Sequence, residues 1–115
     1  MKNKKDANAT YHQPFKDRVY FWAQRLKVKP NQVRIQRMTR KWASCSSGGY
    51  VTFADDIVNE SKAFQDYVIV HELLHLRVPN HGKLFRSLLG AYVPDSKRFF
   101  CRHNGEEQNA ILKRT

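Results

Sequence analysis

Apolar residues recur at helical spacing near the start of the chain. They are Phe15, Val19, Trp22, Ala23 and Leu26. This period of about 3.6 residues, with basic residues on the opposite side, predicts a helix that begins at Pro14 and ends before Pro30. The preceding residues 1–12 are polar, lysine-rich and aperiodic. We expect them to form a mobile basic arm.

The apolar period changes to two after Pro30. Val33 and Ile35 alternate with polar neighbours, as in a strand with one buried face and one solvent-exposed face. Two further apolar stretches, residues 42–45 and 50–53, flank Ser-Ser-Gly-Gly, whose glycines suit a tight reversal. We therefore expect a β-hairpin and, together with the first strand, a small antiparallel sheet of about three strands.

The longest apolar stretch, residues 61–76, contains neither glycine nor proline. It predicts a helix with Ser61 as its N-cap, and Pro79 blocks its continuation. A shorter helix is predicted by a later apolar stripe, which comprises Leu84, Phe85, Leu88 and Leu89. We expect Gly90 to end that helix, and residues 94–100 to form a last helical segment.

Length and composition place these elements in one α+β domain over residues 13–115. The 115 residues suit a single core, and a hydrophobic content of 41% is enough to fill one. No run approaches the ~20 apolar residues of a membrane span, and no apolar stretch follows the basic start. Cys45 and Cys101 are too few for a disulfide framework, so we expect free thiols and a cytoplasmic location.

Positive charge is concentrated in residues 1–41. The net charge of the chain is +11, and this segment holds twelve lysines and arginines against two aspartates. Such asymmetry favours an anionic partner, with nucleic acid as the first candidate. The alternative is a solvated face without a partner. Nucleic-acid contact through residues 1–41 is therefore one of two open interpretations.

The predicted buried helix contains His71-Glu72-Leu73-Leu74-His75, an H-E-x-x-H motif. Residues four apart lie one above the other on a helix, so His71 and His75 can reach one ion. Glu72 falls on the same arc of about 100°. Burying these three polar groups together is costly unless a divalent cation satisfies them. The alternative is a chance pentapeptide whose histidines bond to carbonyls or water.

A catalytic zinc site generally takes three protein ligands and leaves one position to water. His81 follows His75 by six residues, after a turn that Pro79 enforces, and it is the predicted third ligand. A carboxylate is the alternative, from Asp95, Glu106 or Glu107. Val78 occupies the glycine position of the metzincin motif, and no methionine follows Met38, which argues against a metzincin.

Two blocks of the sequence carry a resemblance to a known family. Residues 40–49 read Arg-Lys-Trp-Ala-Ser-Cys-Ser-Ser-Gly-Gly, and residues 67–76, continued by 80–85, contain the histidines. In order and separation these blocks resemble the YgjP-like metallopeptidases, small zincins distantly related to the SprT-like proteins. The family hairpin reads Arg-Trp-Gly-Ser-Cys-Ser, so Ala43 replaces its glycine and Lys41 an arginine.

The resemblance implies a minimal zincin-like core, in which a small sheet packs on the H-E-x-x-H helix between N-terminal and C-terminal helices. It implies zinc bound by His71, His75 and His81. Glu72 would be the general base for hydrolysis of a peptide bond in a peptide or protein substrate. Related zincins align their substrate on an edge strand, for which the hairpin of residues 42–53 is the candidate. The oxyanion donor stays open among Tyr50, Tyr92 and Arg98.

The favoured function is therefore zinc-dependent peptide hydrolysis. The rival interpretation is a nucleic-acid-associated binding module in which zinc is structural or catalytically idle. A structural site closes its fourth position with Cys or His and needs no carboxylate beside the metal. This sequence offers Glu72 and no obvious fourth ligand, which favours catalysis.

Overall fold

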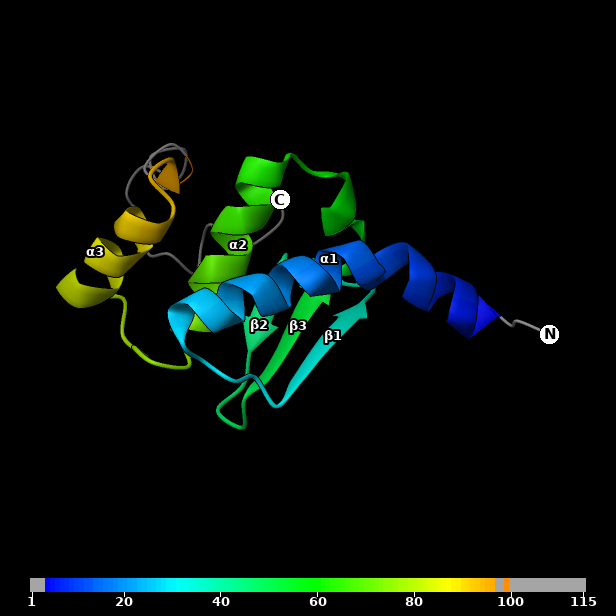
Figure 1. Ribbon diagram of the computed structural model, residues 1–115, viewed down its shortest axis with the longest axis horizontal. Helices are drawn as coiled ribbons and strands as arrows, with labels where there is room; N and C mark the ends of the chain where they lie inside the picture. The colour runs from blue at the N-terminus through cyan, green and yellow to red at the C-terminus, as the bar shows by residue number, and fades with distance from the viewer. Residues whose placement is uncertain (1–3, 97–98, 100–115) are drawn as a thin grey trace.

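The computed structural model describes residues 4–96 and 99, which fold into α-helices and a three-stranded sheet (Figure 1). The elements in chain order are α1 (Lys4–Leu26), β1 (Gln32–Gln36), β2 (Ala43–Cys45), β3 (Tyr50–Ala54), the 3-10 helix η1 (Asp55–Asn59), α2 (Lys62–Leu74) and α3 (Lys83–Tyr92). This is the predicted α+β class. None of the described helices combines the length and the apolar character that crossing a membrane requires.

The sheet is mixed, so the predicted antiparallel arrangement is wrong for β1. β3 lies in the middle and pairs parallel with β1 and antiparallel with β2. The chain reverses once between β1 and β2 and again before β3, so β3 runs in the direction of β1. Residues 37–49 supply the connection of about a dozen residues that a parallel pair requires.

The predicted hairpin between β2 and β3 is confirmed. The N–H of Ser46 donates to the carbonyl of Tyr50 at 2.9 Å, and the N–H of Gly49 donates to the carbonyl of Ser46 at 3.0 Å. Gly49 has a φ of 87°, in the left-handed region that side chains disfavour. A Cβ there would lie 3.0 Å from the side chain of Asn31. The reversal therefore depends on the glycine that the sequence analysis assigned to it.

Helix α1 begins at Lys4 and contains Pro14, which is the predicted start. Proline is favoured in the first helical turn, but inside a helix it removes one backbone hydrogen bond without preventing helical residues before it. Residues 4–12 of the predicted arm are therefore helical. The division into an arm and a domain over residues 13–115 stays a prediction. Four of the five apolar positions of the pattern are buried, namely Phe15, Val19, Ala23 and Leu26.

Helix α2 has the predicted N-cap, because Ser61 Oγ accepts a hydrogen bond from the N–H of Phe64 at 3.2 Å. The helix ends at Leu74, short of the predicted end at residue 76. The last turn tightens, because the N–H groups of His75, Leu76 and Arg77 donate to carbonyls three residues back, and Pro79 disfavours helical conformation in the residue before it, Val78. His75 is consequently the C-cap residue.

Helix α3 passes through Gly90, its predicted end, and stops at Tyr92. A glycine weakens a helix by about 1 kcal/mol but does not terminate it, whereas Pro94 disfavours helical conformation in the residue before it, Val93, which is the non-helical C-cap. Residues 96 and 99 are helical, and Phe99 is buried. The rest of the predicted last segment, including Phe100, lies outside the described residues.

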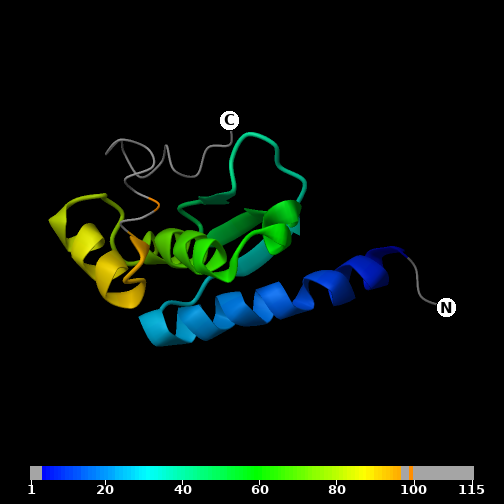
Figure 2. The ribbon, with the colours of Figure 1, turned by 90° about the horizontal axis from the view of Figure 1, so that it is seen from above.

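Helices α1 and α2 lie next to each other over one face of the sheet (Figure 2). Helix α1 contacts β1, and α2 contacts β2. Phe15 of α1 meets Phe53 of β3 edge to face, with ring centroids 5.1 Å apart. The opposite face of β1 carries exposed polar residues, as the alternation of the strand predicted.

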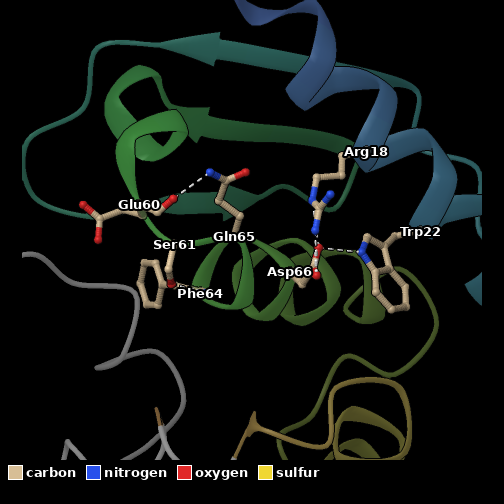
Figure 3. A network of polar contacts seen from close by, with 7 residues as sticks. All are labelled: Arg18, Trp22, Glu60, Ser61, Phe64, Gln65 and Asp66. Atoms are coloured by element: carbon tan, nitrogen blue, oxygen red, sulfur yellow. Dashed lines mark hydrogen bonds and ion pairs between the residues drawn. The ribbon is translucent and has the colours of Figure 1, made fainter.

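Asp66 ties the two helices together near the start of α2 (Figure 3). Arg18 of α1 donates to both of its carboxylate oxygens, at 3.0 and 2.9 Å, and Trp22 Nε1 donates to the first of them at 3.0 Å. Bidentate pairs between arginine and a carboxylate are geometrically specific. The contact fixes α2, the helix that carries the H-E-x-x-H motif, against α1.

Candidate active site

The three histidines singled out in the sequence lie together. One ligand atom from each of His71, His75 and His81 lies within 4.8 Å of the other two. His71 belongs to the last turn of α2, His75 is its C-cap, and His81 lies in the connection to α3. The ring centroids of His75 and His81 are 4.5 Å apart. The turn at Pro79 therefore brings the chain back to the end of α2.

His71 presents a buried nitrogen without a hydrogen-bond partner. Its Nδ1 donates to Glu72 Oε2 at 3.3 Å, which leaves the lone pair on Nε2. Among the described residues, nothing hydrogen-bonds to this Nε2, although the side chain is fully buried. An unsatisfied buried polar atom costs roughly 1–3 kcal/mol, which a bound cation would remove.

His75 is held in the tautomer that suits a metal ligand. Its Nδ1 donates to the carbonyl of Pro79 at 3.2 Å, so the lone pair again lies on Nε2. Burial, and then the charge of His71, lower the pKa of His75 below its usual range. The ring therefore stays neutral to lower pH, and the neutral ring is the form that binds metals.

The Nε2 atoms of His75 and His81 are 2.8 Å apart. Two imidazole nitrogens so close either share a proton or bind one ion. Nitrogen ligands at 2.0–2.1 Å in a tetrahedral zinc site are about 3.3 Å apart, so a small adjustment suffices. Within the described residues the group has three members, all histidines, which is the ligand number of catalytic zinc sites. The donor set fits zinc.

Glu72 is only 3% exposed and lies beside the triad on α2. Its charge reaches Cys45 on β2: burial raises the pKa of that thiol to about 11, and Glu72 adds to the rise. Cys45 is a free thiol, as predicted, whereas Cys101 lies outside the described residues. Strand β2 and the motif helix therefore border the same site.

The remaining candidates that the structure describes, Tyr50, Tyr92 and Asp95, are not part of the histidine group. Tyr50 is exposed, with Arg34 over its ring at 5.0 Å, and Tyr92 packs against Trp22 at 6.4 Å. No contact among the described residues joins either tyrosine to the histidines. Asp95 is exposed and is not part of the histidine group. Three other candidates, Arg98, Glu106 and Glu107, lie outside the described residues.

Sequence reasoning assigned Phe85 only to the core-facing stripe of α3, but its ring contacts all three histidines. Phe85 follows His81 by one helical turn. This spacing is the only sign in the sequence that Phe85 lies near His81, and an ordinary core residue of the helix would show the same spacing.

Comparison with protein families gives a match over residues 3–99, to the family described as YgjP-like, metallopeptidase domain. The chain belongs to the YgjP-like family. The resemblance seen in the sequence is thereby confirmed, and the protein is a metallopeptidase. A YgjP-like metallopeptidase uses a divalent metal and acts on peptides or proteins, so the enzyme class predicted from the motif is confirmed as well.

The fold is similar to that in the crystal structure of the metallopeptidase zymogen of Pyrococcus abyssi abylysin. The TM-score is 0.61 at 19% sequence identity, and the likeness covers 78% of this chain and 95% of that chain. It supports the α+β metallopeptidase fold of the YgjP-like chain. No protein of curated function matches the sequence.

Proposed function

We propose that the chain is a zinc-dependent peptidase in which His71, His75 and His81 hold the ion and Glu72 is the general base. The observation that carries the proposal is the buried Nε2 of His71, which lacks a hydrogen-bond partner among the described residues and belongs to a group of three converging imidazoles. When bound, zinc supplies Lewis acidity that acidifies water and polarises a carbonyl group.

The chain's own residues would orient the ligands and move the proton. Glu72 and the carbonyl of Pro79 hold His71 and His75 with Nε2 free to ligate. A carboxylate has about four lone-pair sites, so Glu72 can accept from His71 and still take a proton from the attacking water. It returns that proton to the leaving amine, and the peptide bond is hydrolysed without a covalent intermediate.

Strand β2 lies at an edge of the described sheet, and this edge is the proposed docking site for a substrate. The carbonyl of Trp42 accepts from Ala54 at 2.8 Å, and the N–H of Ser46 donates to β3. Alternation along the strand turns the backbone groups of Ala43 and Cys45 the other way, where no described strand pairs with them. An extended peptide that adds to this edge would run past Glu72.

Cys45→Pro tests this docking edge. Proline removes the outward N–H, and edge strands tolerate proline at such positions. We expect kcat/KM for an extended peptide to fall about tenfold, the equivalent of roughly one hydrogen bond, with zinc content unchanged. Cys45→Ala, which loses the thiol but keeps the N–H, is the matched control. Equal kcat/KM values for the two variants would argue against docking on β2.

The proposed function is tested by incubating the purified chain with an unfolded protein and identifying new termini by mass spectrometry. We expect cleavage that stops when a chelator removes zinc and returns when zinc is added back. A chain that carries zinc but cleaves neither an unfolded protein nor a diverse peptide library would contradict the proposal.

Nucleic-acid contact through residues 1–41 and a cytoplasmic location stay predictions. The comparisons give no support to a nucleic-acid-binding module. Part of the positive charge is engaged within the fold, since Arg18 is paired with Asp66 and Arg34 lies over Tyr50.

A further inference from the structure

We propose that Phe85 is a positioning residue of the metal site, which fixes the orientation of all three imidazoles relative to one another. The proposal rests on the proposed site of His71, His75 and His81. The hydrogen bonds of the site do not fully fix the orientation of the imidazole rings, and we assign the remaining restraint to this apolar side chain.

Phe85 is fully buried, and its ring centroid lies 5.3 Å from that of His71 and 4.9 Å from those of His75 and His81. Aromatic rings interact favourably at centroid distances of about 4.5–7 Å. The ring planes of His71 and His81 stand at 78° and 90° to that of Phe85, the edge-to-face arrangement that such pairs prefer. One side chain therefore restrains ligands from two different segments.

His81 has the most to gain from this contact, because it lies in a connection rather than on a helix. Phe85 sits in the first turn of α3, one turn after His81. The N-cap of α3 is Gly82, which offers no side-chain hydrogen bond, and the buried residues of the helix are Phe85 and Leu89, which pack it against the core. Docking of Phe85 thus places His81 beside the other two ligands.

The hydrogen bonds at Nδ1 of His71 and His75 fix which nitrogen carries the proton, but a single hydrogen bond at one atom leaves the ring free to rotate about that bond. A phenyl ring in contact with each imidazole limits that rotation. Phe85 carries no polar atom, so it can neither ligate the ion nor move a proton, and any effect on the metal must act through the histidines. Ligands held in place beforehand lose less side-chain entropy on binding.

Phe85→Leu and Phe85→Met test the proposal, with Phe53→Leu as the matched control. Phe53 is also fully buried and contacts Phe15, and no described ring contact joins it to the histidines. The measurements are the zinc Kd, by competition with a chelator, and the visible spectrum of the Co²⁺-loaded protein. Changes around metal ligands typically weaken affinity 10–100-fold. We expect at least about a tenfold rise in Kd and an altered Co²⁺ spectrum in the Phe85 variants alone.

The outcomes separate the two proposals. A wild-type chain that binds neither Zn²⁺ nor Co²⁺ overturns the metal site and the positioning role together. If the wild type binds both ions and the Phe85 variants match Phe53→Leu in Kd and spectrum, the site stands and the positioning role is overturned. Loss of the fold in both Phe85 variants, but not in Phe53→Leu, also overturns it, because Phe85 would then serve the core.

Discussion

Replacing Glu72 by glutamine is expected to lower kcat by about 10²–10⁴-fold, the usual contribution of a general base, while zinc content and fold are retained. The amide oxygen can still accept the hydrogen bond from His71 Nδ1, which Glu72 accepts at 3.3 Å, so the ligand keeps its orientation. The amide cannot take up the proton of water. The loss would therefore fall on the chemical step.

Turnover on a peptide substrate, zinc content and circular dichroism are measured together for this variant. Glu60→Gln is the control, because Glu60 is exposed and its described contact to Gln65 uses its backbone carbonyl, which the substitution keeps. Comparable turnover by Glu72→Gln and the wild type would remove Glu72 from the mechanism.

The double substitution His71→Ala, His75→Ala is expected to reduce bound zinc from one ion per chain to nearly none. Both side chains lie in the converging group, and His81 alone offers a single nitrogen ligand. Zinc at about 100 times its Kd should stabilise the wild type by about 2.7 kcal/mol and leave the variant unchanged. Elemental analysis and thermal unfolding with and without zinc measure both effects.

His12→Ala is the control for this experiment, since it removes a histidine of α1 that is not part of the group. It should retain full zinc content. Wild-type stoichiometry in the double variant would show that the ion binds elsewhere.

The group of three histidines could be predicted from the sequence because its geometry is local. Residues four apart on a helix face the same way, which places His71 and His75, and a proline-enforced turn limits where His81 can lie. The contact of Phe85 with these rings could not be predicted, because an apolar residue in a core-facing stripe gives no sign of which side chains it meets across the interface.

The strands were predictable, whereas their arrangement was not. Alternation in β1 identifies the buried Val33 and the exposed residues beside it, but it does not say which strand lies next to it or in which direction. Helix ends were misplaced where a single glycine or proline was given too much weight. Gly90 lies inside α3, where burial of Phe85 and Leu89 outweighs the local propensity of the glycine. Pro14 lies inside α1, which begins ten residues before it.

Strand β2 contains only three residues, Ala43–Cys45, an edge of about 10 Å. Under the proposed docking, its outward backbone groups make a few hydrogen bonds to the substrate backbone, and none of these bonds distinguishes one side chain from another. The enzyme would then select its substrates by their conformation, because the segment around the scissile bond must be extended and must not be packed in a folded structure. If a substrate docks in this way, folded proteins would be spared, and unfolded chains would be accessible with little dependence on their sequence.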